Sequence, residues 1–181
     1  MTPPPRHLLV TGLPGSGKTT LVRRLAEVFL PYRPAGFYTE EVRKQGARQG
    51  FRLVGLDGSE GMLAHRKFKG PPRVGRYGVD LSGFEAFLAR LRLAEGAAPL
   101  VFLDEIGRME CLSPAFARLV EDLLGGPRVV VATVAAKGGG LIAAVKRRPD
   151  VRLLRVEARR REAAFLEAVR RVRELLDRRG G

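Results

Sequence analysis

Apolar residues follow two different spacings along this chain, and the two spacings alternate. Four short apolar runs, at residues 7–11, 99–104, 128–134 and 151–156, have the length and composition of buried strands. Between them lie segments in which apolar residues recur every three or four positions, as on the buried face of a helix. Strands that alternate with helices predict the α/β class, with a mostly parallel sheet covered by helices on both faces.

Individual residues mark the expected helices. Leu21, Leu25 and Val28 would form the buried stripe of a helix that opens soon after the first strand. Ser82 and Glu85 match a capping box, the pair of side chains that closes the first turn of a helix. The other helices are predicted at residues 113–125, where Ser113 and Pro114 mark the start, at 139–147 and at about 159–178.

Residues 34–68 interrupt this alternation. Short β-prone runs separated by glycine-containing turns predict an antiparallel meander inserted after the first helix. The segment 69–78, which is rich in glycine and proline, is expected to be a loop. The sequence contains neither repeats nor a linker-like stretch, so we expect residues 1–181 to form a single domain.

A glycine-rich loop follows the first predicted strand. Gly12 to Thr19, with the sequence GLPGSGKT, fit the pattern G-x-x-x-x-G-K-[ST] at every position. Glycines let the backbone wrap closely, so that successive N–H groups face phosphate oxygens, and the following helix adds its positive N-terminal dipole. In this pattern Lys18 reaches the β- and γ-phosphates, and the Thr19 hydroxyl coordinates Mg²⁺. The loop is therefore predicted to bind phosphates.

Two adjacent carboxylates, Asp104 and Glu105, end the second apolar run. A protein with this glycine loop needs a carboxylate at the end of a neighbouring strand to hold Mg²⁺, usually through water, and Asp104 has that position. Glu105 is expected on the other side of the pleat, where it could orient a water near the γ-phosphate. The alternatives are a cap or turn role for Asp104 and a surface role for Glu105.

Four longer motifs occur in order, and their combination is specific. They are GLPGSGKTT at 12–20, AGFYTEEVR at 35–43, VGRYGVDL at 74–81 and VFLDEIGRMEC at 101–111. With these motifs the sequence resembles the cancer-related nucleoside-triphosphatase family, small P-loop enzymes of archaea, bacteria and animals, over nearly the whole chain. The resemblance implies a RecA-like P-loop NTPase fold. It also implies slow, Mg²⁺-dependent hydrolysis of ATP, GTP, CTP and UTP to the diphosphate and phosphate.

The resemblance further implies roles for particular residues. Lys18 and Glu105 would be catalytic, with Glu105 activating the attacking water, and Thr19 and Asp104 would belong to the magnesium site, Asp104 through water. One departure is an arginine near Arg160, where related sequences commonly carry an asparagine. The implied nucleotide contacts are Gly12, Leu13, Pro14, Gly15, Ser16, Gly17, Lys18, Thr19 and Thr20, followed by Leu103, Asp104, Glu105, Ile106, Gly107 and Arg108.

Charge that develops on the transferred phosphoryl group needs a cation in addition to the loop lysine. Arg108 is the preferred third catalytic residue because it lies three residues past Glu105. Arg43, Lys137 and Arg160 are the other candidates.

Three further side chains could approach the nucleotide. Thr133 ends a buried strand and either senses the γ-phosphate or is an ordinary β-branched strand residue. Glu40 and Glu41 follow one another on the first meander strand and are expected on opposite sides of it. One of them could reach the nucleotide, and a polar edge of the sheet is an equal alternative.

The formal net charge of +14 leaves nucleic-acid binding open. Part of this charge lies near the C-terminus, where Glu157 precedes Arg161, Glu167 precedes Arg171 and Glu174 precedes Arg178, each at i,i+4. An acid four residues before a base is the favourable order on a solvated helix face. Because aromatic residues that could stack on bases are not interleaved there, a solvated surface is favoured over a nucleic-acid surface.

The remaining composition bears on location and partners. A single cysteine, Cys111, cannot form an internal disulfide, which favours the cytoplasm. The longest apolar run, 129–136, is too short to span a membrane, and the N-terminal residues do not resemble a signal peptide. His7 and His65 lack metal-ligand spacing, so Mg²⁺ is the cofactor expected. A monomer or weak oligomer is expected.

Two other functions are compatible with the glycine loop. A nucleotide or small-molecule kinase shares the loop, but such kinases usually place helices or an acceptor lid where this chain has its predicted meander. A nucleic-acid-binding P-loop module would bind with an affinity that falls steeply as salt rises. Phosphate release without an added acceptor separates a hydrolase from a kinase.

Overall fold

The computed structural model describes residues 4–179. The four predicted apolar runs form β1 (His7–Gly12), β7 (Leu100–Ile106), β8 (Val129–Ala135) and β9 (Val151–Arg155). The inserted region forms β2 (Ala35–Lys44), β3 (Ala47–Gly55), β4 (Glu60–His65), β5 (Arg73–Val74) and β6 (Tyr77–Val79). Within the described residues these strands make one nine-stranded sheet in the order β5-β6-β4-β3-β2-β7-β8-β1-β9.

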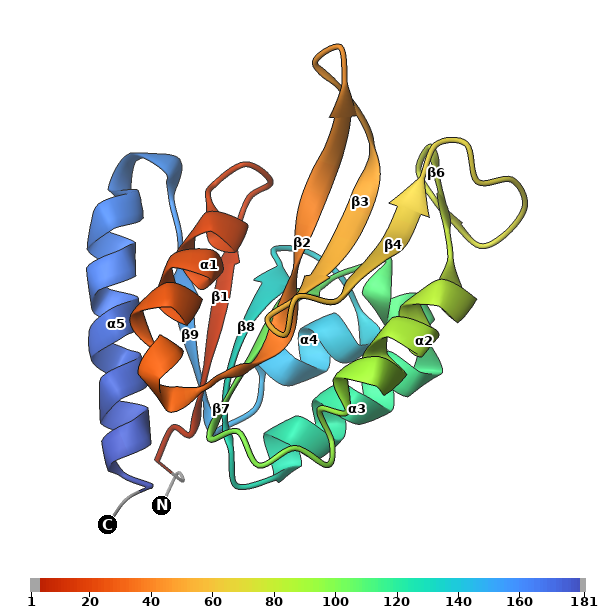
Figure 1. Cartoon of the computed structure of the whole chain (residues 1–181). Helices are drawn as coiled ribbons and strands as arrows, with labels where there is room; N and C mark the ends of the chain where they lie inside the picture. The colour runs from red at the N-terminus through yellow and green to blue at the C-terminus, as the bar shows by residue number, and fades with distance from the viewer. Residues whose placement is uncertain (1–3, 180–181) are drawn as a thin grey trace.

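Helices cover both faces of the parallel part of the sheet, as Figure 1 shows. One face carries α1 (Lys18–Val28) and α5 (Arg161–Asp177), and the other carries α2 (Leu81–Leu91), α3 (Pro114–Gly125) and α4 (Gly140–Lys146). Strands β2, β7, β8, β1 and β9 pair in parallel, whereas β2 to β6 pair antiparallel. The predicted α/β fold with an antiparallel insertion is confirmed. No helix in residues 4–179 combines the length and apolar character needed to cross a bilayer.

The central strands are apolar on both sides because they are covered on both sides. On β7, Val101 and Leu103 pack into the core beneath α2, α3 and α4. Leu100 and Phe102, which alternate with them, pack against α1 and α5. This two-sided burial explains why the strand sequence is continuously apolar instead of alternating with polar residues.

The insertion is longer than the sequence predicted. The segment 69–78, expected to be a loop, contains β5 and the start of β6, so that expectation was wrong in part. Tyr77 and Val79 on β6 are buried, and the Tyr77 ring meets Phe51 edge-on with the ring centroids 5.3 Å apart. Long-range packing of these side chains outweighs the local tendency of glycine and proline to break strands.

Gly36 allows the insertion to join the parallel sheet. At this point β2 pairs with β7, and Gly36 lies opposite Phe102 with a φ of +128°. A Cβ atom on Gly36 would lie 1.9 Å from the Phe102 carbonyl oxygen, so a side chain would force the two strands apart. Gly46, at the β2–β3 turn, has a φ of +76° but nothing within 4 Å of its Cβ position.

Two of the predicted helix signals were wrong. The Ser82–Glu85 capping box does not form, because Asp80 caps α2 by accepting a 2.9 Å hydrogen bond from the Gly83 N–H. Glu85 instead accepts a 2.6 Å hydrogen bond from the Ser113 hydroxyl, which links α2 to the start of α3. On α1, Val28 is 40% exposed, since the buried stripe runs through Leu21, Val22, Leu25 and Ala26.

His7 is a buried structural residue on β1, as expected. Its Nδ1 accepts a 3.2 Å hydrogen bond from the Val130 N–H, so Nε2 carries the proton and donates to the Leu124 carbonyl at 3.1 Å. Burial lowers the pKa of His7 to about 4, although the Asp150 carboxylate 3.8 Å away opposes this. Protonation would place a second N–H against that of Val130, with no acceptor between them.

Candidate active site

The glycine loop connects β1 directly to α1. Gly17 caps the helix with a φ of +102°, and Gly15 has a φ of +77°, so both occupy backbone conformations that L side chains rarely adopt. Gly12 is required for space, because a Cβ atom there would lie 2.5 Å from the Val156 carbonyl oxygen and 2.6 Å from the Ser16 hydroxyl. The local sequence therefore dictates the curvature of the loop and leaves α1 beginning at Lys18.

Asp104 is a fully buried carboxylate that joins three strands and the loop. The Thr19 hydroxyl lies 3.1 and 2.9 Å from its two oxygens, and the Thr133 hydroxyl donates to Oδ1 at 2.6 Å. Thr39 donates to Oδ2 through its N–H and its hydroxyl, both at 3.2 Å. The structure thus brings Thr19 and Asp104 together as predicted, and it adds Thr39 to the same cluster.

Glu105 and Lys18 lie beside this cluster. Lys18 Nζ donates to the Gly12 carbonyl at 3.1 Å and lies 3.7 Å from Glu105 Oε2. Burial raises the pKa of the Glu105 carboxyl, and the Asp104 charge adds to this effect, whereas Lys18 lowers it. Glu105 therefore binds a proton more readily than a solvated glutamate, which favours a role as general base.

The expectation that Glu105 projects away from Asp104 was wrong. Lys18 and Thr19 are adjacent in sequence, and one contacts Glu105 while the other contacts Asp104. The cause is a register shift between β7 and β8. Leu103 pairs with Ala132 and Ile106 pairs with Val134, so two residues of β7 lie opposite a single residue of β8. An extra residue in one strand breaks the simple alternation of side chains and turns both acids towards the loop.

A cleft of about 940 Å³ opens in front of these residues. The glycine loop and α1 form one wall, and the insertion forms the other, at the end of the molecule where the β2–β3 hairpin projects (Figure 1). Lining side chains outside the glycine loop include Thr39, Glu40, Glu41, Arg48, Phe51, Glu105, Arg108, Glu110, Lys137 and Arg161. The cleft is large enough for a nucleotide and polar enough along the loop to bind its phosphates.

The predicted contacts differ in how they reach this cleft. Gly12, Leu13, Pro14, Gly15, Gly17, Lys18, Thr19 and Thr20 line it, as do Glu105 and Arg108. Leu103 and Ile106 point into the core and are fully buried, so only their backbone could approach a ligand. Ser16 is buried beneath the loop, and its hydroxyl has no hydrogen-bond partner among residues 4–179. Gly107 follows the bulge of β7.

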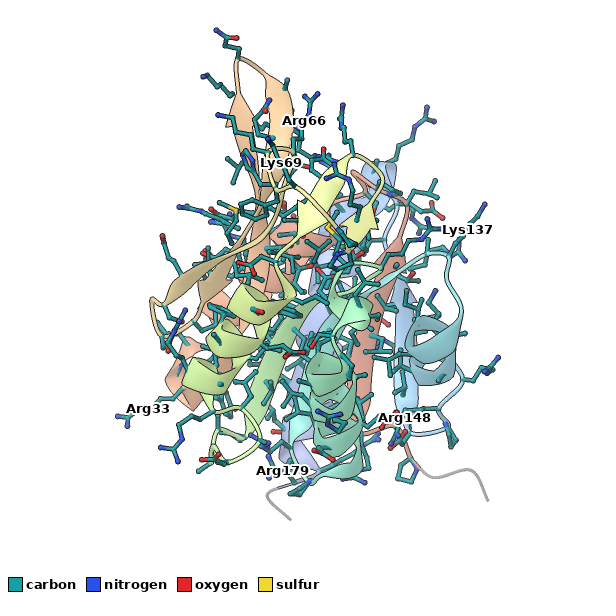
Figure 2. All side chains as sticks on the ribbon, turned by 90° about the vertical axis from the view of Figure 1, so that its right-hand side faces the viewer. Arg33, Arg66, Lys69, Lys137, Arg148 and Arg179 are labelled. Carbon is teal, nitrogen blue, oxygen red and sulfur yellow. The ribbon has the colours of Figure 1, made fainter. Side chains whose placement is uncertain are left out.

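The candidate cations are distributed unevenly. Arg108 is exposed on the cleft wall, whereas Arg43 is paired with Glu41 at 2.5 Å in the β2–β3 hairpin. Lys137 lies at the rim and extends outwards, at the same end of the molecule as Arg66 and Lys69 (Figure 2). Arg160 lies outside the cleft lining, in the short helix η3 (Ala158–Arg160).

The two glutamates of β2, Glu40 and Glu41, pair with different arginines. Glu40 contacts Arg23 at 3.2 Å and Arg52 at 2.6 Å, and Glu41 contacts Arg43 and Arg48.

Sequence reasoning missed Arg161 as a residue of the site. It was expected to pair with Glu157, but its Nε donates to the Ser16 carbonyl at 2.9 Å and its Nη2 donates to the Gly15 carbonyl at 2.7 Å. Its side chain lies against Gly17, where a Cβ atom would be 2.9 Å from Arg161 Nε. Arg161 thus fastens the glycine loop to α5, and nothing in the local sequence distinguishes it from its arginine neighbours.

The oxygen-rich cluster fits a magnesium ion. A buried carboxylate and a threonine hydroxyl are hard ligands of the kind Mg²⁺ prefers, and this ion usually takes its remaining ligands from phosphates and water. Within residues 4–179, no three His, Cys, Asp or Glu side chains are grouped as a site built from protein ligands alone would require. Asp104 and Thr19 are the residues that would hold the ion together with the nucleotide.

Comparison with known proteins bears on the identity of the chain. A family model described as NTPase matches residues 7–169. This chain belongs to that NTPase family. The matched residues include the glycine loop, the insertion and both acids of β7.

Curated relatives and solved structures agree with this assignment. A nucleoside-triphosphatase THEP1 of Thermotoga sp. (strain RQ2) is 38% identical, covering 88% of this chain and 91% of that protein. The cancer-related nucleoside-triphosphatase of Homo sapiens is 38% identical, covering 83% and 88%. The crystal structure of THEP1 from Aquifex aeolicus superimposes with a TM-score of 0.78 at 31% identity, covering 90% of this chain and 96% of that one.

The solution structure of a human cancer-related nucleoside triphosphatase gives a TM-score of 0.79 at 36% identity, covering 93% of this chain and 98% of that one. The family resemblance predicted from the four motifs is therefore confirmed for this NTPase. The similarity extends through the insertion, which is the part of the fold that the glycine loop alone could not identify.

Proposed function

We propose that this chain hydrolyses nucleoside triphosphates to the diphosphate and phosphate, slowly, with Mg²⁺ and with broad tolerance of the base. The carrying observation is the contact of Thr19 with Asp104 at 2.9 Å, beside the contact of Lys18 with Glu105 at 3.7 Å. These contacts join the phosphate-binding loop to the acidic end of β7, which is the arrangement that phosphoryl transfer requires.

In the proposed reaction the chain mainly binds, orients and exchanges a proton. Backbone N–H groups of the glycine loop and the Lys18 side chain hold the phosphates and stabilise the charge on the γ-phosphoryl group. Glu105 accepts the proton of the attacking water, and Arg108, which also lines the cleft, adds a positive charge near the transferred group. Magnesium, when bound by Thr19 and by Asp104 through water, would neutralise phosphate charge.

Broad base tolerance is proposed because the glycine loop and Lys18, which line the cleft, would contact the phosphates that all four nucleotides share. In the segment after β9, where the family resemblance led us to expect an asparagine, the chain has Arg160, which lies outside the cleft lining. Contacts to phosphates are the same for every nucleotide, so hydrolysis of ATP, GTP, CTP and UTP should differ little in kcat.

The test is phosphate release from these four nucleotides by the wild type and by Glu105→Gln. The amide keeps the shape but cannot accept the proton, so we expect kcat to fall by about 10² to 10⁴, the range for general-base catalysis. Glu121→Gln, at an exposed position on α3, is the matched control and should leave kcat unchanged. Undiminished hydrolysis by Glu105→Gln would refute the proposed base.

The same assay separates a hydrolase from a kinase. It is run without any phosphoryl acceptor except water, with Mg²⁺ and then with an excess of chelator. We expect release with Mg²⁺ and almost none with chelator. Formation of the diphosphate without free phosphate, beginning only when a nucleoside monophosphate or an alcohol was added as acceptor, would support the kinase alternative instead.

A further inference from the structure

Glu110 is a buried acid four residues after the end of β7, and the proposed reaction does not use it. It opens the short helix η2 (Glu110–Leu112), is 6% exposed, and contributes to the wall of the cleft. It forms no ion pair with any residue in the described range 4–179. Burying a carboxyl group without a cation costs free energy unless the group is neutral or forms hydrogen bonds.

The surroundings of Gly107 indicate that the neighbouring group is Glu105. A Cβ atom built on Gly107 would lie 2.8 Å from Glu105 Oε1 and 2.8 Å from Glu110 Oε2. The two carboxyl oxygens therefore border the same space, about the size of a methyl group, over this glycine. The φ of Gly107 is not in the positive range, so its backbone conformation does not require glycine. The absence of a side chain at Gly107 keeps the space between these two carboxyl oxygens open.

The oxygens of Glu105 have different neighbours. Oε2 lies 3.7 Å from Lys18 Nζ, whereas Oε1 borders the space over Gly107 that Glu110 Oε2 also borders. Burial raises the pKa of Glu110 to about 8, with further contributions from the charges of Glu105 and Asp104, while backbone N–H groups at Glu110 and Gly107 lower it. At neutral pH Glu110 is therefore mainly a neutral acid with a proton to donate.

We propose that Glu110 is a positioning residue for hydrolysis, which donates a hydrogen bond to Glu105 Oε1 while Lys18 attracts Oε2. Held from two sides, the Glu105 carboxylate keeps one orientation, and each of its oxygens retains a lone pair for the attacking water. This inference rests on the proposed role of Glu105. In this inference Glu110, the last acid of the DEIGRME segment, affects the reaction through Glu105 and does not contact the nucleotide.

The first test replaces the proton donor. Glu110→Met fills a similar volume without a hydrogen-bonding group, and Glu110→Gln keeps a donor in its amide. We expect kcat to fall about 10- to 100-fold for Glu110→Met, the size of effect that misplacement of a reacting group produces. For Glu110→Gln we expect kcat within about threefold of the wild type, because the amide still donates. KM for ATP should stay within about twofold in both, because the phosphate-binding loop is untouched.

The second test fills the space between the acids. Gly107→Ala should lower kcat about 10-fold or more, since its Cβ would also lie 3.1 Å from Glu105 Cγ and must displace one of the carboxyl groups. Gly125→Ala, at the end of α3, has nothing within 4 Å of its Cβ position and is the matched control. Equal kcat for the two alanine variants would overturn the proposal.

The decisive measurement combines the substitutions. If Glu110 acts through Glu105, Glu110→Met should lower kcat in the wild type but cause no further loss in the Glu105→Gln background. An equal loss in both backgrounds would mean that Glu110 does not act through Glu105. If Glu105→Gln lowers kcat but Glu110→Met and Gly107→Ala do not, this inference fails and the proposed function stands. If Glu105→Gln itself is fully active, the proposed base fails and this inference fails with it.

Discussion

The hydrogen bond between Thr133 and Asp104 should contribute measurably to folding, because both side chains are fully buried. The Thr133 hydroxyl donates to Oδ1 at 2.6 Å, and four donors in all face the carboxylate from Thr19, Thr39 and Thr133. Valine has nearly the shape of threonine and removes only the hydroxyl. A hydrogen bond to a charged group contributes about 1.5–3 kcal/mol. Thr133→Val should therefore lower the free energy of unfolding by about 2 kcal/mol, or Tm by about 4–8 °C for a chain of this length.

The assay is urea unfolding in chelator without nucleotide, so that ligand binding does not contribute. The same substitution is then made in the Asp104→Asn background, where the partner is a neutral amide. There it should cost less than about 1 kcal/mol, because a neutral pair contributes about half as much as a charged one. Equal costs in the two backgrounds would refute the reasoning, since they would mean that Thr133 does not stabilise a buried negative charge.

Three further outcomes follow from the fold and the loop. The pKa of His7 is about 6.5 in the unfolded chain and about 4 in the folded protein. Between these pH values only the unfolded chain binds the proton, so the free energy of unfolding should fall by about 3 kcal/mol as pH drops from about 6.5 to about 4. Urea titrations should show this slope in the wild type and a smaller one in His7→Gln. Gly36→Ala should destabilise the protein by more than about 3 kcal/mol, whereas Gly46→Ala should cost about 1 kcal/mol, as measured by thermal unfolding. Arg161→Met should raise KM for ATP about tenfold, since it loses two hydrogen bonds to the loop, and Arg159→Met should not.

The sequence allowed much of the fold to be predicted, because its signals are local. The strands of the parallel sheet, the start of α3 at Ser113 and the meander all follow from patterns a few residues long. The carboxyl ends of neighbouring parallel strands meet at one edge, so the approach of Asp104 to the glycine loop could also be predicted. The residue roles proposed for Lys18, Glu105 and Arg108 stay predictions until the variants are measured.

The failures have a common cause, which is packing between distant segments. Strand β6 forms because Tyr77 packs on Phe51, and the capping box is lost because Glu85 accepts a hydrogen bond from Ser113. Neither partner lies within the sequence window that a local signal covers. Arg161 likewise differs from its arginine neighbours only in what it reaches.

By itself, the sequence determined that this chain has a phosphate-binding loop, because the backbone freedom of Gly15 and Gly17 and the position of Lys18 are written into consecutive residues. It also determined that two acids end β7. Only the tertiary structure decided that both acids turn to the same side and that Glu110 is enclosed with them. Those outcomes depend on the register of β7 against β8 and on the exclusion of water around the carboxyl groups. Register and desolvation arise from contacts between segments far apart in the chain, so no local pattern encodes them.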